Sequence, residues 1–153
     1  MGLLTPIRLK IAVRKSPTAV WKAWTDPKQI VRWFAGTAHV VAGPGGTYEV
    51  GWGDDAALPH AITEWKTGKA IAFSWGDGTT TRITLSPHGR ETVVEVLSRG
   101  HRDEGQGVEA WAFARQAWAF YLLNLKSVLE RGWDLRDTNR RRVSRAGWVN
   151  FWD

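Results

Sequence analysis

Apolar and polar residues alternate with a period of two along several stretches of the chain. Between residues 7 and 13 the apolar positions are Ile7, Leu9, Ile11 and Val13, and the residues between them are mostly basic. This alternation predicts a strand with one buried face and one basic face exposed to solvent. Turns rich in glycine and proline divide the following region into further strands. We expect these strands at residues 38–42, 47–52, 61–65, 70–75, 79–86 and 92–98.

Helical signals occur on both sides of this β-rich region. Ser16-Pro17 and Asp26-Pro27 each place a capping side chain directly before a proline, which is typical of a helix start. Two short helices are therefore predicted near the N-terminus. Neither glycine nor proline occurs between Val108 and Arg131, and Gly132 follows at the position of a helix C-cap. These features predict one long C-terminal helix.

The long helix is predicted to turn one apolar stripe toward the sheet. At about 100° per residue, this stripe contains Trp111, Trp118 and Leu122, with Arg115 in its middle. A buried guanidinium requires a carboxylate, an aromatic ring or water. Glu64, on a predicted strand, is a candidate partner. Arg115 then either orients a ligand inside a pocket or reaches the pocket rim as a structural residue.

The order of these elements predicts an α+β domain. A strand comes first, followed by two short helices, a run of antiparallel strands and one long helix. Such a sheet buries one face only by packing against the long helix. We expect this domain to span residues 1–133. Residues 134–153 then form a basic and aromatic tail.

The composition excludes several classes of protein. The 153 residues, 43% of them hydrophobic, suit one globular domain, and no apolar run is long enough for a membrane span. Cysteine is absent, and the four histidines have no zinc-binding spacing, so we expect no metal and no cofactor. No catalytic motif is found, so a non-enzymatic protein is expected. The N-terminus has no secretory pattern, and a cytoplasmic location is expected.

The chain carries a net charge of +6 and eleven tryptophans. Basic residues such as those of the run 140–142 suit nucleic acid. A solvated surface is the commoner explanation, so nucleic acid is not an expected partner. The tryptophans either line a cavity or fill it. Phe113, Phe120 and Leu123 project away from the predicted stripe. We expect the tail to cover them, either in the same subunit or in a second copy, which would make a homodimer.

The segment Ser16-Pro17-x-x-Val20-Trp21-x-Ala23-Trp24-Thr25-Asp26-Pro27, followed by Trp33-Phe34, resembles the opening signature of one family. This family comprises bacterial relatives of the activator of the heat shock protein 90 ATPase. It belongs to the START and birch-pollen-allergen-like (SRPBCC) superfamily. Later motifs fit in the same order, namely Gly45-Gly46-x-Tyr48, residues 71–75, residues 92–96 and the end of the long helix. The resemblance covers about residues 5–133.

The resemblance implies a helix-grip fold, in which a curved antiparallel sheet holds the C-terminal helix around a cavity. It also implies binding of a small apolar or amphipathic ligand, which is the function we expect. One alternative is an enzyme of the polyketide cyclase or hydrolase type, which needs Glu64, Glu95 or His60 to face the pocket. Another is a chaperone-activator-like interaction module that uses the basic first strand. The residues expected to line the cavity are Trp24, Trp33, Tyr48, Trp52, Glu64, Trp75, Trp111, Arg115, Trp118 and Leu122.

Overall fold

The computed structural model describes residues 2–52 and 57–137. Its helices are α1 (Pro17–Thr25), α2 (Pro27–Ile30) and α3 (Gln106–Arg131). Its strands are β1 (Ile7–Val13), β2 (Thr37–Val41), β3 (Thr47–Gly51), β4 (Leu58–Lys66), β5 (Ala70–Ser74), β6 (Thr80–His88) and β7 (Glu91–Arg99). All predicted elements are present, with bounds that differ by a few residues.

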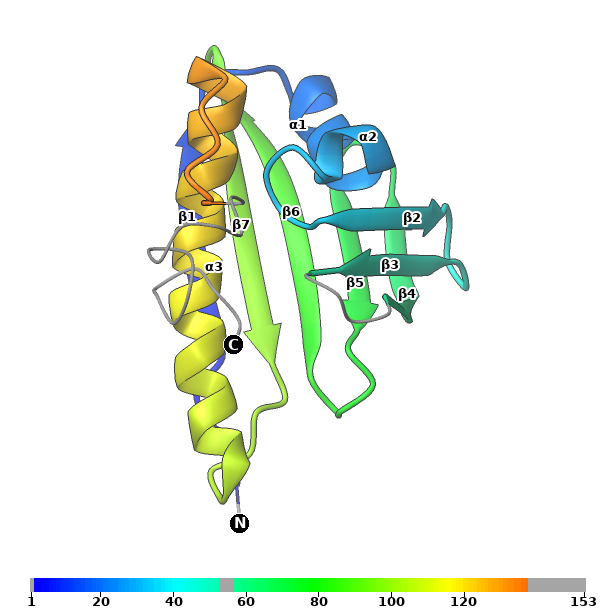
Figure 1. Ribbon diagram of the computed structural model, residues 1–153, viewed down its shortest axis with the longest axis vertical. Coiled ribbons are helices and arrows are strands. Elements are labelled where there is room, and N and C mark those ends of the chain that lie inside the picture. Colours follow the sequence, from blue (N-terminus) through cyan, green and yellow to red (C-terminus); the bar gives the residue numbers. More distant parts are fainter. Residues whose placement is uncertain (1, 53–56, 138–153) are drawn as a thin grey trace.

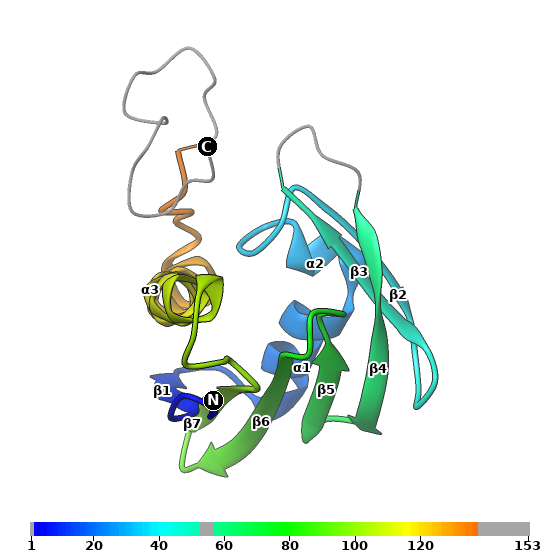
Figure 2. The same ribbon diagram turned by 90° about the horizontal axis from the view of Figure 1, so that it is seen from below.

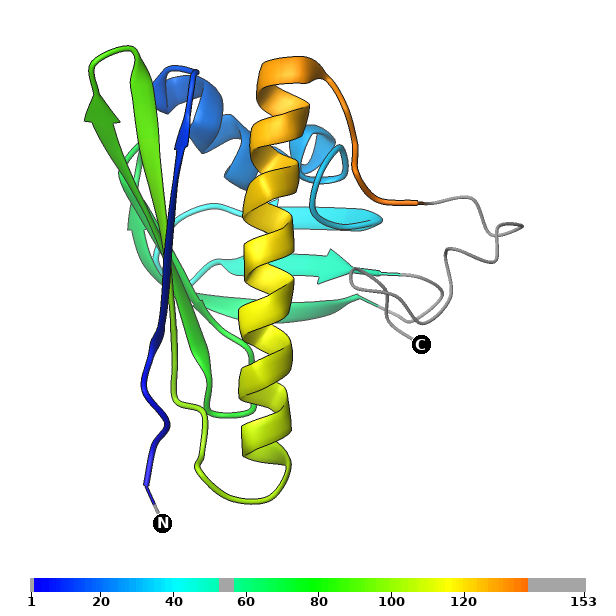
Figure 3. The ribbon, with the colours of Figure 1, turned by 90° about the vertical axis from the view of Figure 1, so that its left-hand side faces the viewer.

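The strands form one antiparallel sheet of seven strands, in the order β1-β7-β6-β5-β4-β3-β2. The sheet curves around α3, which faces its concave side and runs alongside β1 (Figures 1 and 3). A register shift between Ile62 and Glu64 in β4 marks a bulge, a feature that bends a strand. Seen from one end, α1 and α2 also lie within the curve of the sheet (Figure 2). This arrangement confirms the α+β helix-grip fold.

Both short helices begin as their capping residues predict. Ser16 Oγ accepts a hydrogen bond from the N–H of Ala19 at 3.2 Å, which caps α1. Asp26 Oδ1 accepts one from the N–H of Lys28 at 2.9 Å, which caps α2. These caps satisfy backbone donors that have no partner inside the helix. The two caps mark two changes of chain direction within a short segment. Trp24 and Trp33, which lie on either side of the second cap, contact each other.

The core at this end of the molecule is packed with aromatic rings. The centroids of Trp24 and Trp33 are 4.6 Å apart with their planes nearly perpendicular, and Tyr48 stacks on Phe73 at 4.6 Å. Trp33 Nε1 donates to the carbonyl of Ala23 at 2.8 Å. The Tyr48 hydroxyl donates to the carbonyl of Trp24, also at 2.8 Å. All four large rings are fully buried, so they fill the space beneath α1 and α2.

The basic residues of β1 lie on the face of the sheet opposite α3, where carboxylates pair with them. Glu95 of β7 accepts from Arg8 at 2.7 Å and also pairs with Lys10 at 3.3 Å. Arg14, just after β1, lies 3.7 Å from both Glu91 and Glu130. The predicted basic face is therefore present, but its charge is partly neutralised by neighbouring carboxylates.

Residues 134–136 contact the domain through a group of hydrogen bonds that we call the C-terminal latch, made by Asn124, Asp134, Leu135 and Arg136. Asn124 is fully buried, and its Nδ2 donates to the carbonyl of Trp33 at 2.7 Å and to Asp134 at 3.0 Å. Its Oδ1 accepts from the N–H of Leu135 at 2.7 Å.

Arg136 extends the latch to the chain after α2, donating to the carbonyl of Val31 at 2.8 Å and that of Ala35 at 3.1 Å. The start of the predicted tail is thus attached to the domain. The prediction that the tail covers Phe113, Phe120 and Leu123 concerns residues 138–153, which lie outside the described residues. Within the described part of the chain, no helix is long and apolar enough to cross a membrane.

Candidate functional site

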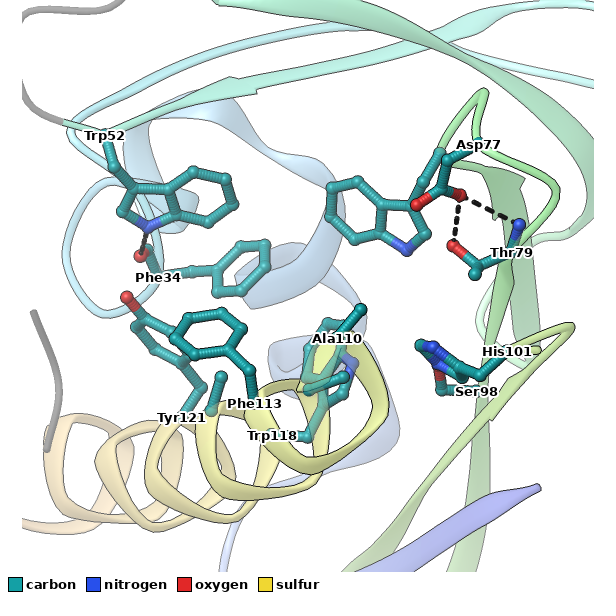
Figure 4. A pocket seen from close by; sticks show the side chains of 13 residues that line it. Phe34, Trp52, Asp77, Thr79, Ser98, His101, Ala110, Phe113, Trp118 and Tyr121 are labelled. Carbon is teal, nitrogen blue, oxygen red and sulfur yellow. Dashed lines mark hydrogen bonds between the residues drawn. The ribbon is translucent and has the colours of Figure 1, made fainter. Parts of the chain in front are cut away.

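A pocket of about 390 Å³ lies between the N-terminal half of α3 and the concave face of the sheet (Figure 4). This volume falls within the range of about 300–1,000 Å³ that is common for small-molecule sites. Six of the thirteen lining residues are Phe, Trp or Tyr, and three alanines of α3 leave the space that larger side chains would fill. The residues that line the pocket are Phe34, Trp52, Trp75, Asp77, Thr79, Ser98, His101, Ala110, Phe113, Ala114, Ala117, Trp118 and Tyr121.

Hydrogen bonds and ring contacts fix the aromatic walls. Trp52, which follows β3, donates from Nε1 to the carbonyl of Phe34 at 2.6 Å. The ring of Phe34 stacks on Trp118 at 5.5 Å and meets Tyr121 edge-on at 5.0 Å. Trp75, at the end of β5, donates from Nε1 to Thr81 Oγ1 at 2.8 Å. The aromatic walls are therefore fixed by contacts within the protein itself.

Polar side chains gather at one end of the pocket, which we call the polar corner: Asp77, Thr79, Ser98 and His101 (Figure 4). Asp77 Oδ1 accepts from the N–H of Thr79 at 2.8 Å and from its hydroxyl at 2.5 Å. Ser98 Oγ lies 3.0 Å from His101 Nε2. The polar corner thus consists of two pairs, one in the turn between β5 and β6 and one at the end of β7.

Gly100 allows His101 to enter the polar corner. Its φ of 95° favours glycine, and a Cβ at this position would clash with the carbonyl oxygen of Gly78. The loop after β7 can therefore approach the turn between β5 and β6. The carbonyl of His101 accepts from the N–H of Leu4 at 2.8 Å, which fixes the backbone. As a result, the imidazole of His101 is only 6% exposed.

Both ionisable groups of the polar corner have a lowered pKa, which favours a neutral His101 and a negatively charged Asp77. Burial lowers the pKa of His101, although the nearby carboxylate of Asp77 raises it in part, so the imidazole is neutral at neutral pH. Burial raises the pKa of Asp77, but the hydrogen bonds from Thr79 outweigh this and hold it below its usual value. Asp77 therefore carries a negative charge at the pocket rim.

The structure brings three of the predicted lining residues to the pocket, namely Trp52, Trp75 and Trp118. Trp24, Trp33 and Tyr48 are instead fully buried in the aromatic core, and Leu122 also packs in the core. They lie outside the pocket because α1 and α2 occupy that end of the concave face (Figure 2).

The candidate pairing of Arg115 with Glu64 is wrong. Arg115 is exposed, with its guanidinium over the ring of Trp111 at 5.7 Å, and Trp111 Nε1 donates to the carbonyl of Thr5 at 2.8 Å. Glu64 lies on the face of the sheet opposite α3, where it accepts from Arg82 at 2.7 and 3.1 Å. The physical reason is the rotation of α3, which turns Ala114, Trp118 and Tyr121 inward in place of Arg115.

Two of the three groups named for acid–base catalysis also face away from the pocket. Glu64 and Glu95 both hold ion pairs on the opposite face of the sheet. His60 contacts Trp75 edge-on at 4.7 Å but does not line the pocket. Among residues 2–52 and 57–137, no group of three or more metal-ligating side chains occurs.

The ion pair of Glu64 predicts a specific pH dependence of stability. Hydrogen bonds from Arg82 lower the pKa of Glu64 from 4.5 to about 2. Because the folded-state pKa is the lower one, the pair stabilises the protein fully above about pH 4.5, and this contribution is lost as the pH falls toward 2. We therefore expect Glu64→Gln to flatten the decline in the free energy of unfolding over this interval, measured by urea denaturation at stepped pH.

The matched control for this experiment is Glu104→Gln, which makes the same change at an exposed glutamate. This variant should follow the wild-type pH profile. If Glu64→Gln declined in parallel with the wild type, the pair would contribute nothing to acid stability.

Sequence reasoning missed several residues of the pocket. The helical pattern predicts Phe113 on the outer side of α3, yet it lines the pocket together with Tyr121. Ser98 and His101 lie at the edge of a polar, glycine-rich segment after β7, whose pattern predicts only a loop. Their spacing of three residues across Gly100, directly after an alternating strand, is the signal that links them.

The chain matches one family model and resembles several solved structures. The model of a family described as Activator of Hsp90 ATPase homolog 1-like protein matches residues 14–130. No curated protein is significantly similar to the chain. Among solved structures, the protein SSP2350 from Staphylococcus saprophyticus is 25% identical with a TM-score of 0.75, and the match covers 86% of this chain and 96% of that one.

Two other structures share the fold at lower identity. The Aha1 dimer from Colwellia psychrerythraea is 21% identical with a TM-score of 0.70, over 84% of this chain and 98% of that one. DynU16, described as a putative protein in the dynemicin biosynthetic locus, is 22% identical with a TM-score of 0.69, over 83% of this chain and 48% of that one.

Proposed function

The chain belongs to the family of Activator of Hsp90 ATPase homolog 1-like proteins, and from this premise we propose that it binds a small apolar or amphipathic molecule in the pocket under α3. The observation that carries the proposal is the pocket itself, which combines fixed aromatic walls with one polar end. Concave sites with mostly apolar walls and a few placed polar groups are typical of small-molecule binding.

The small residues of α3 support this proposal further. Ala110, Ala114 and Ala117 face the pocket at positions where α3 turns toward the sheet, while Trp118 and Tyr121 flank them. Ala110 is exposed and Ala114 and Ala117 are half-buried, so their small side chains leave this face of α3 open toward the pocket. The space above these alanines is therefore available to a ligand.

A hydrolase-type reaction in the same pocket is the second candidate. The distance of 3.0 Å between Ser98 Oγ and His101 Nε2 favours it, because a nucleophile and a base must lie within hydrogen-bond reach. DynU16, which shares the fold, is described as belonging to a biosynthetic locus. The acid that orients the base in such sites has no counterpart here, since Nδ1 of His101 has no partner among the described residues. Plain binding is therefore the better supported function.

An interaction module that docks through the basic strand is less well supported, because Arg8 and Lys10 both pair with Glu95. Self-association through the tail remains a prediction. The Colwellia psychrerythraea protein, which shares the fold, is described as a dimer, and this description supports self-association without indicating which surface takes part.

Filling the pocket tests the proposed function. We expect Ala117→Trp to weaken binding of the neutral probe N-phenyl-1-naphthylamine by at least about tenfold, which corresponds to about 1.4 kcal/mol. The added indole would occupy the space next to Trp118 and Tyr121. Binding is measured by the rise in probe fluorescence, and native mass spectrometry of the freshly purified protein shows whether a molecule is already retained.

The matched control is Ala119→Trp, the same substitution on the exposed side of α3. It should bind the probe as the wild type does. The proposal would be overturned if the wild type bound neither the probe nor a retained molecule, or if both variants bound equally while remaining folded.

A further inference from the structure

The charge of the pocket is opposite in sign to the charge of the whole chain. The chain has 21 lysines and arginines and a net charge of +6. None of these basic residues is among the thirteen that line the pocket, all of which belong to the described ranges. The one charged group of the lining is the carboxylate of Asp77, because burial lowers the pKa of His101 and leaves it neutral. The pocket therefore carries one negative charge that no lining residue balances.

Asp77 also differs from the carboxylates on the outer face of the sheet. Glu64 pairs with Arg82 and Lys66, and Glu95 pairs with two basic residues of β1. Within the described part of the chain, Asp77 forms no ion pair. Both hydrogen bonds from Thr79 go to its Oδ1, which leaves Oδ2 available to another partner. In Figure 4 this second oxygen points away from Thr79, toward the aromatic side of the pocket.

A ligand can reach this carboxylate, and its chemistry defines what it binds. Asp77 is an exposed residue of the lining, so a molecule that enters from solvent meets it at the pocket rim. The hydrogen bonds from Thr79 fix the side chain and hold its pKa below the usual value, so it is ionised at neutral pH. An ammonium group supplies both the N–H donors and the positive charge that an ionised carboxylate binds most strongly. Trp75 also lines the pocket, and indole rings attract cations.

The same charges disfavour an anionic ligand. A ligand carboxylate would leave water without a cation to pair with, which is strongly unfavourable. The aromatic walls formed by Phe34, Trp52 and Trp118 suit a flat ring system as the apolar part of the ligand.

We propose that the pocket selects an amphipathic amine, with an aromatic body between the walls and an ammonium group paired with Asp77 Oδ2. This inference rests on the proposed function, since it names the class of ligand that the same pocket takes. Fatty acids and other carboxylates, which an aromatic pocket alone would accept, are expected to bind poorly.

Three probes with the same naphthalene ring test the proposal. At neutral pH 2-(aminomethyl)naphthalene is a cation, 2-ethylnaphthalene is neutral and of similar size, and 2-naphthoate is an anion. Each is titrated as a competitor of N-phenyl-1-naphthylamine. We expect the wild type to bind the amine at least about tenfold more tightly than 2-naphthoate, because only the cation finds a partner when it leaves water.

The variant Asp77→Asn removes the charge but keeps an oxygen that can accept from Thr79. It should weaken binding of the amine about threefold to tenfold, as expected for a charge-assisted contact at an exposed carboxylate, and leave 2-ethylnaphthalene within about twofold. Retained binding of the neutral probe shows that the pocket is intact. The control is Asp103→Asn, the same change of charge at an exposed aspartate outside the pocket lining, and it should keep the wild-type preference.

The wild-type protein provides a readout that does not depend on the variant's folding. Because coupling between two bound groups is reciprocal, an ammonium group paired with Asp77 lowers the pKa of this carboxyl further. In ¹³C NMR spectra, the titration midpoint of the Asp77 carboxyl should therefore move to lower pH with the amine and stay in place with 2-ethylnaphthalene.

Three results would overturn the inference and leave ligand binding intact: equal affinities of the wild type for the amine and 2-naphthoate, an unchanged affinity of Asp77→Asn for the amine, or an Asp77 midpoint that the amine does not move. Failure of N-phenyl-1-naphthylamine itself to bind, with no molecule retained, would instead overturn the proposed function.

Discussion

Replacing Trp33 with alanine is expected to lower the free energy of unfolding by about 3–5 kcal/mol, the range for deletion of a large aromatic side chain from a core. Trp33 has no exposed surface, contacts Trp24 and Phe34, and donates from Nε1 to the carbonyl of Ala23. Its removal leaves a cavity at the point where α1 and α2 meet the sheet. Urea denaturation followed by circular dichroism measures the loss.

The chain offers a matched control in Trp133, which is 74% exposed. Trp133→Ala should change the free energy of unfolding by less than about 0.5 kcal/mol, as is usual for surface positions. Similar losses in the two variants would show that Trp33 is not the packing centre that its contacts indicate.

A milder pair of substitutions separates packing from hydrogen bonding. Trp24 is as deeply buried as Trp33, but its Nε1 has no hydrogen-bond partner among the described residues. Trp33→Phe leaves the carbonyl of Ala23 without its donor, whereas Trp24→Phe removes a polar atom that was unpaired. Trp33→Phe should therefore be the more destabilising of the two.

Replacing Asn124 with leucine is expected to have the second-largest effect, a loss of about 2–5 kcal/mol. Leucine is similar in size, so the loss arises from hydrogen bonds. The buried carbonyl of Trp33 would lose its partner at about 1–3 kcal/mol, and the partly exposed N–H of Leu135 would lose its partner at a somewhat smaller cost. The same denaturation experiment measures this change.

A double-mutant cycle with Arg136→Ala tests whether the C-terminal latch acts as a unit. Arg136 binds Asp134, which in turn accepts from Asn124. Since the residues share partners, the two losses should add up to more than the loss in the double variant. Strict additivity would mean that Asn124 and Arg136 stabilise the protein independently.

The regular parts of this fold are predictable from local signals. The alternation of residues 7–13 and the capping pairs Ser16-Pro17 and Asp26-Pro27 are properties of short segments, and each is present in the structure as expected. The family signature that spans the two short helices adds the long-range arrangement that such local patterns lack.

Which face α3 turns toward the sheet cannot be predicted from a short segment of sequence. An apolar stripe through Trp111 and Trp118 is evident in the sequence, but α3 contacts β1 along one side and the pocket along another. Phe113 and Tyr121 therefore face inward, and Arg115 is exposed above Trp111. A helix with two partly apolar sides has no single stripe from which its rotation can be read.

The sequence also does not predict which tryptophans fill the core and which line the pocket. Trp24 and Trp52 are the same residue type, but their surroundings differ. Trp24 is enclosed by the rings of Trp33, Phe34 and Trp118, whereas Trp52 forms a pocket wall. Which indole meets another ring and which meets a cavity depends on distances between elements that only the folded chain defines.

The first strand and the last helix complete the same half of this molecule. β1 pairs along its whole length with β7, and α3, which follows β7, closes over the concave face beside it. During synthesis on the ribosome, β1 therefore has no pairing partner until nearly the entire domain has emerged. Until then the apolar inner surface has no cover, so the nascent chain depends on late, long-range contacts and folds more slowly than its helices alone would allow.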